Sequence, residues 1–125
     1  MRRTLTRLCV LSIIPLVVGG CAGTMENYQK SNVAKVLKPL GIYEDCMDLA
    51  SGQVLNYSFE ASAPLSFNIH YHEGDDVIYP VSKEKAVSDS GSMLCDKREK
   101  YCLMWTNIHG DTATVTYSYH VEVRK

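Results

Sequence analysis

Two histidines separated by a single residue are the clearest candidates for chemistry in this sequence. His70 and His72 belong to the segment LSFNIHYHEGDDVIYPV, residues 65–81. On a strand, side chains two residues apart project to the same face, so these imidazoles would be close enough to share a metal ion. Glu73 follows directly and would add an oxygen ligand. One hypothesis is therefore a copper or zinc site built from His70, His72 and Glu73.

The alternation around the histidines points to a different use of this face. Apolar residues occupy every second position of the segment, at Leu65, Phe67, Ile69 and Tyr71. These residues are expected to face a core, which turns the histidines away from it, whereas the metal ligands of a cupin barrel point inward. Three interpretations stay open for His70 and His72: surface or structural residues, part of a partner-binding face together with Asn68, or metal ligands.

The N-terminus predicts export. Arg2, Arg3 and Arg7 precede an apolar run at residues 8–18, which has the layout of a secretory signal peptide. A membrane-spanning helix needs roughly 20 apolar residues, so this run is too short to be one. Residues 1–20 are therefore expected to be removed.

The run ends in Val18-Gly19-Gly20-Cys21, which resembles the bacterial lipobox. In that motif the cysteine is diacylated on sulfur and becomes the mature N-terminus, so Cys21 is the predicted lipidation site; the alternative is an ordinary cleavage site near Ala22. Several acyl chains anchor a protein firmly because each buried methylene contributes roughly 0.8 kcal/mol. By analogy with the bacterial sorting rule, Ala22 in place of an aspartate favours the outer membrane over the inner one. We expect the domain on the periplasmic side.

Apart from the lipidated Cys21, the mature chain contains Cys46, Cys95 and Cys102. Three thiols in an oxidising envelope predict one disulfide and one leftover thiol. Under the chain-entropy model a Cys46–Cys102 bond stabilises by roughly 4 kcal/mol, against 2 to 3 kcal/mol for the shorter Cys95–Cys102 loop. Cys46–Cys102 is our hypothesis. Since energy alone does not decide connectivity, Cys95–Cys102 is kept as the alternative.

Composition argues against a nucleic-acid partner. The chain has a formal net charge of −1, and Lys97, Arg98 and Lys100 are interrupted by Glu99, which is typical of a solvated turn rather than a basic groove. The sequence contains no phosphate loop, nucleophile elbow or His-Glu-x-x-His motif. We therefore expect no enzyme activity and no cofactor, although a Ser/His/Asp triad needs no local motif and stays open.

The elements that position these residues follow from periodicity. Residues 21–41 are expected to form the lipidated N-terminus, a flexible tether and one short helix, since Val33, Val36, Leu37 and Leu40 recur at helical spacing before Gly41. From residue 42 onward the pattern has period two. Strands are predicted at residues 53–59, 65–71, 77–81, 101–105 and 113–123, and turns at 51–52, 73–75, 90–91 and 109–111.

Two residues refine this assignment. Pro80 makes residues 77–81 an edge strand or a strand end, because proline cannot donate to a sheet ladder. Trp105 is expected in the core, with a partner for its indole N–H. Short strands punctuated by frequent turns predict a small antiparallel β-sandwich, jelly-roll-like, over residues 42–125.

These residues resemble the GOLD domain, the luminal β-sandwich of the p24 cargo-receptor family. The matching motifs, in family order, are Cys46-Met47-Asp48-Leu49, Gly52, Tyr57-Ser58-Phe59, Phe67-Asn68-Ile69 and Tyr101-Cys102-Leu103-Met104-Trp105-Thr106-Asn107. The family cysteine lies three residues before the asparagine, whereas Cys102 lies five before Asn107, which keeps it on the same strand face and leaves a Cys46–Cys102 bridge possible. The resemblance implies a sandwich with a protein- or lipid-interaction role, and the expected partner is an envelope protein.

Overall fold

A computed structural model describes residues 28–123 of the chain. The predicted signal peptide, the lipidation site Cys21 and the tether up to residue 27 lie outside the described residues. The described part is built from strands, and it contains no helix long and apolar enough to cross a membrane.

Six antiparallel strands form one sheet. They are β1 (Gln29–Leu37), β2 (Ile42–Leu49), β3 (Gln53–Glu73), β4 (Asp76–Leu94), β5 (Glu99–Thr106) and β6 (Ala113–Val123). Their order is β1-β6-β3-β5-β2, and β4 pairs with β3 beside this path. The predicted all-β antiparallel class is confirmed.

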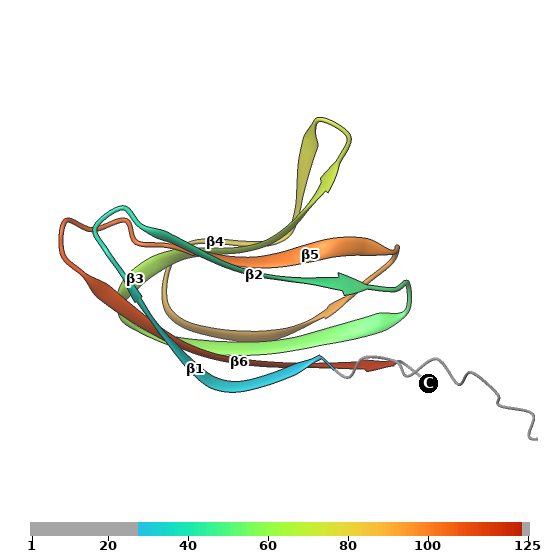
Figure 1. The fold of residues 1–125 in the computed structure, drawn as a ribbon, viewed down its shortest axis with the longest axis horizontal. Helices are drawn as coiled ribbons and strands as arrows, with labels where there is room; N and C mark the ends of the chain where they lie inside the picture. Colours follow the sequence, from blue (N-terminus) through green and yellow to red (C-terminus); the bar gives the residue numbers. More distant parts are fainter. Residues whose placement is uncertain (1–27, 124–125) are drawn as a thin grey trace, which may run out of the picture.

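The sheet curls over because β3 and β4 are long enough to serve both layers (Figure 1). The first part of β3 pairs with β6, from Gln53 to Ala61. Its second part pairs with β5, from Ser66 to His70. The β3–β4 register shifts between Glu60 and Leu65, where the strand passes between layers. The sequence predicted two strands here; one bulged strand forms instead, because an extended chain tolerates Pro64 at a bulge.

The core lies between the layers and centres on Trp105, which has no exposed surface. Its indole packs against the rings of Tyr117 at 4.7 Å, Phe67 at 5.2 Å and Phe59 at 5.8 Å. The predicted core position is therefore confirmed. The expected partner for the indole N–H is absent: among the described residues no acceptor reaches Nε1, because aromatic rings surround it.

The predicted short helix is wrong. Residues 29–37 form β1, which pairs with β6 through Val33↔Tyr117 and Leu37↔Ala113, so Gln29 to Asn32 also belong to the sheet rather than to a tether. The apolar spacing of this segment fits a helix, but Val36 is 71% exposed while Leu37 is buried. Pairing with β6 overrides the local pattern, since helix propensity is a weak prior against tertiary contacts.

The predicted turn at Ser90-Gly91 is also wrong. Both residues lie inside β4, where Gly91 is the register partner of Tyr57. The glycine makes room for the aromatic ring, because a Cβ there would lie 2.9 Å from Tyr57 Oη. Glycine in this strand therefore serves packing rather than a turn.

The other predicted turns and the predicted edge position of Pro80 agree with the structure. Gly52 and Gly74 have φ angles of 88° and 61° in tight turns, a conformation that glycine adopts without steric cost. Pro80 lies on β4, which within the described sheet pairs only with β3 and is therefore an edge strand.

Asn107 is fully buried. Its Nδ2 donates to the carbonyls of Leu37, Lys38 and Asp111 at 3.2, 3.2 and 2.7 Å. These hydrogen bonds join the β1–β2 turn to the β5–β6 loop.

Candidate functional site

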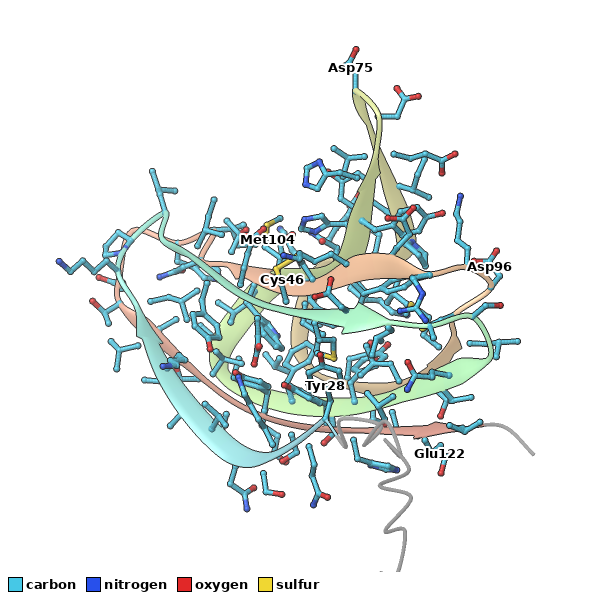
Figure 2. All side chains as sticks on the ribbon, turned by 45° about the vertical axis from the view of Figure 1, so that its right-hand side comes forward. Tyr28, Cys46, Asp75, Asp96, Met104 and Glu122 are labelled. Carbon is cyan, nitrogen blue, oxygen red and sulfur yellow. A yellow bond between two sulfur atoms is a disulfide. The ribbon has the colours of Figure 1, made fainter. Side chains whose placement is uncertain are left out.

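The end of β3 and the start of β4 project from the sandwich as a hairpin, with Asp75 at its tip (Figure 2). We call residues 70–80 the arm. Gly74 and Asp75 form its two-residue turn, and residues 72–80 are all exposed. The arm carries the histidine pair that the sequence singled out.

The strand register divides the arm into two faces. His72 pairs with Val77 and Tyr71 with Ile78, while a bulge after Ile69 leaves His70 opposite Tyr79 and Pro80. Because directly opposed residues share a face of an antiparallel pair, one face carries His70, His72, Val77 and Tyr79. We call this the histidine face. Tyr71, Glu73 and Ile78 lie on the other.

His70 faces away from the core, as predicted, but it is not a surface residue: only 5% of it is exposed. Its Nδ1 donates to Asn68 Oδ1 at 2.8 Å, and Nε2 lies 3.5 Å from Glu44 Oε1. The rings of His72 and Tyr79 pack against it, with centroids 5.4 and 5.8 Å away. The bulge brings Tyr79 over His70, so of the two histidines only His72 is exposed.

Burial lowers the pKa of His70 below its ordinary value. The Glu44 carboxylate opposes this effect and the nearby His72 adds to it. The neutral ring is favoured, because removing an imidazolium from water costs more free energy than its attraction to the half-exposed Glu44 carboxylate provides. His70 is therefore a neutral hydrogen-bonding residue beneath the exposed His72 at neutral pH.

The structure does not bring the hypothetical metal ligands together. Glu73 lies on the opposite face of the arm, where its Oε2 accepts a hydrogen bond from Lys97 Nζ at 2.5 Å. Asn68 already engages Nδ1 of His70. Among residues 28–123 no group of three His, Cys, Asp or Glu side chains is arranged to hold a metal ion.

The second face of the arm is braced against the body of the domain. Lys97, predicted to lie in a solvated turn, sits with its Nζ 5.1 Å from the centroid of the Tyr71 ring. The Tyr71 ring also packs edge-on against Tyr101 at 5.2 Å, and Tyr101 Oη donates to the Lys97 carbonyl at 2.9 Å. These contacts hold the base of the arm and set its direction.

The disulfide joins Cys46 to Cys102, so the hypothesis drawn from the sequence is confirmed, and Cys95 is the free, buried thiol. The two half-cystines are direct partners on β2 and β5. Cys102 is also the register partner of His70. The bond therefore lies on the outer face of the sheet, beside the histidine face, and ties the edge strand β2 to β5 (Figure 2).

Exposed apolar side chains occur at several places, among them the arm and the β1–β2 turn. On the arm, Val77 is 37% and Tyr79 53% exposed on the histidine face, and Ile78 is 37% exposed on the opposite face. At the β1–β2 turn, Val36, Leu40 and Ile42 are exposed as well. Sequence reasoning found His70 and His72 but missed Tyr79 and Glu44, because only the bulge and the β2–β5–β3 register bring these two to the histidines.

The comparisons with known proteins bear on the fold. No family model matches the chain, and no curated protein matches it. A similar solved structure is the crystal structure of the mitogen derived from Yersinia pseudotuberculosis (YPM), with a TM-score of 0.54 and 10% identity over 79% of this chain and 90% of that chain. At this identity the likeness shows the fold alone. The resemblance to the GOLD domain stays a prediction.

Proposed function

We propose that this chain is a non-enzymatic binding module of the bacterial envelope, anchored to the outer membrane by lipid on Cys21. It binds an envelope protein through the histidine face of the arm. The observation that carries the proposal is the arm itself, a braced hairpin that projects from the sandwich (Figure 1) and whose Val77 and Tyr79 are exposed.

The chemistry of this face suits a protein partner. Exposed apolar residues that project together mark interaction sites more often than isolated ones do. Tyrosine contributes strongly at interfaces because it offers a rigid apolar ring with a polar end. The arm is held by Lys97, Tyr101 and the His70 contacts, so binding would order few additional groups. Such preorganisation lowers the entropic cost of association.

The acidic residues at the tip of the arm restrict which partner surfaces can fit it. Glu73, Asp75 and Asp76 surround its tip, and only Glu73 has a basic partner among the described residues, in Lys97. A matching partner therefore offers an apolar pocket for Val77 and Tyr79, bordered by basic side chains.

Crosslinking in intact cells tests the site. A photoreactive residue is placed at Val77 or Tyr79 of the full, exported chain, and at Leu40 or Ser82 as exposed controls. We expect the same discrete crosslinked protein from both arm positions and not from the controls. The purified partner should bind Tyr79→Ser at least about tenfold more weakly than the unchanged chain. Equal crosslinking at Leu40, or equal affinity of Tyr79→Ser, would contradict the proposal.

The anchor is tested separately. Cys21→Ala should abolish incorporation of a clickable fatty acid and move the protein from the membrane to the soluble fraction of the envelope. Persistent fatty-acid labelling in this variant would rule out Cys21 as the lipidation site and leave the arm's function untouched.

A further inference from the structure

A polar groove crosses the outer face of the layer that lies away from the arm. It has a volume of about 560 Å³ between β1 and β4, with Ser58, Glu60 and Ser118 along its floor. A second hollow of about 170 Å³ continues it and shares Ser58 and Ser118 with it. We call the two together the serine groove.

The strand register explains the lining of the serine groove. Three rows of short polar residues run across β6, β3 and β4: His120–Asn56–Ser92, Ser118–Ser58–Ser90 and Thr116–Glu60–Ser88. Neighbouring strands lie about 4.8 Å apart, and rows two residues apart are separated by about 6.8 Å. The groove floor is therefore a regular lattice of hydroxyl, amide and carboxylate groups, backed by the aromatic core on the other side of the same strands.

A β-bulge completes one wall. The register of β1 shifts between Lys30 and Val33, and Asn32 within the bulge has a φ of 51°. Its backbone N–H donates to Ser118 Oγ at 2.9 Å, and Asn32 lines the groove. Asparagine tolerates this left-handed conformation better than most residues, and bulges often re-aim a side chain beside a binding site.

Four polar side chains of the larger hollow are free to bind a ligand. Within residues 28–123, the side chains of Ser58, Ser88, Ser90 and Glu60 have no hydrogen-bond partner in the chain. Serine hydroxyls both donate and accept, and they lose little rotamer freedom on binding. A ligand with many hydroxyl groups meets these four free side chains in the larger hollow, whereas Asn56 and Ser92 of the neighbouring row already hydrogen-bond to each other and Asn56 also to Glu122.

The charges of the larger hollow exclude other ligand classes. Glu60 projects into it from the outer face of β3, and no described basic residue lines it. Lys30 and His120 line the smaller hollow, and Lys30 is paired with Asp45. The larger hollow therefore disfavours phosphate, sulfate and nucleic acid, and an apolar ligand would find few apolar side chains to contact. From the lattice and these charges we propose that the serine groove binds an uncharged oligosaccharide. This inference is independent of the arm, which lies on the other layer.

Binding of defined sugars tests the proposal. The full lipidated chain, kept in a detergent without a sugar headgroup, is titrated with chitohexaose and maltohexaose and compared with a sulfated oligosaccharide of equal length. We expect saturable binding of at least one neutral sugar and none of the sulfated one. The double variant Ser58→Val, Ser90→Val should weaken that binding at least about tenfold, since valine removes the hydroxyls but suits a strand.

Controls separate binding from folding. Ser82→Val removes a serine from β4 outside the groove and should leave sugar affinity unchanged, as should Tyr79→Ser in the arm. Each variant should keep the thermal unfolding midpoint of the unchanged chain within a few degrees. Absence of neutral-sugar binding at millimolar concentration, preference for the sulfated sugar, or equal affinity in a folded Ser58, Ser90 double variant would each overturn the proposal.

Discussion

His70 is the residue at which the histidine face meets the disulfide-bearing strands. It contacts Asn68 on its own strand, Glu44 across two strands and Tyr79 from the bulged edge strand. A titratable ring in this position makes the stability of the arm base depend on pH.

The pH dependence has a defined sign. Because burial lowers the folded-state pKa of His70, the unfolded chain takes up a proton first as pH falls through the ordinary histidine value of about 6.5. Neutral His70 therefore contributes fully to the free energy of unfolding above that pH, and this contribution is lost as the pH falls below it. Urea unfolding at pH 7.5, 6.5 and 5.5 should therefore give a falling free energy of unfolding, and His70→Gln should flatten this decline.

His72→Gln is the matched control, since it changes the exposed histidine of the same pair. It should preserve most of the decline. If His70→Gln and the unchanged chain lose the same free energy between pH 7.5 and 5.5, the pH dependence originates in other residues.

At the scale of elements, β4 depends on a glycine packed beneath an aromatic ring. Gly91→Ala would place a methyl group 2.9 Å from Tyr57 Oη and 3.2 Å from its Cζ, against a ring whose hydroxyl donates to Asp89 at 3.1 Å. We expect a loss of about 1–3 kcal/mol in the free energy of unfolding, as for other overpacked sites.

A double-mutant cycle checks the cause. Tyr57→Phe removes the nearest atom, so Gly91→Ala should cost less in that background than in the unchanged chain. If the effects of the two substitutions are additive, the loss of stability caused by Gly91→Ala arises in the backbone of β4 and not from the contact with the Tyr57 hydroxyl.

The disulfide acts at the same scale, because it fastens the edge strand β2 to β5 across a sequence separation of 56. Replacing both Cys46 and Cys102 with alanine should cost about 2–5 kcal/mol in the free energy of unfolding, mainly through the unfolded chain. Denaturant titrations of the oxidised protein, the reduced protein and the double variant should place the last two close together. A double variant as stable as the oxidised protein would refute this role.

For the whole molecule, the closure of the sandwich depends on one buried carboxylate between its two layers. Asp45 on β2 accepts hydrogen bonds from Lys30 Nζ on β1 at 2.6 Å and from Tyr117 Oη on β6 at 2.5 Å. Burial and the nearby Asp45 carboxylate raise the pKa of Tyr117, which keeps its hydroxyl protonated as the donor. The two layers are thus joined at their open edge.

Asp45→Ala should lower the free energy of unfolding by about 1–3 kcal/mol, because it leaves buried polar groups without their acceptor. Lys30→Met should cost less than about 1 kcal/mol, since Lys30 is half-exposed and its ion pair is screened by water. Urea titrations compare the two variants. Equal losses would assign the closure to the ion pair rather than to the tyrosine hydrogen bond.

The accuracy of sequence-based prediction varied with how local each feature is. The strand at residues 113–123 was predicted with its bounds intact, because a long alternation of apolar and polar residues has one period. The segment at residues 33–40 was assigned wrongly, because four apolar residues fit a helix as well as a strand until β6 is placed beside them. At Gly91 the turn signal was misleading, because the reason for the glycine lies across the sheet at Tyr57.

By itself, the sequence determined which side chains face the core. Alternation is a property of adjacent residues, so it placed Phe67, Ile69 and Tyr71 inside, and the structure agrees. Register and bulges depend on contacts between residues far apart in the chain, so only the tertiary structure decided that Tyr79 covers His70. The same long-range pairing lines up Ser118, Ser58 and Ser90 on three strands, which no local pattern contains.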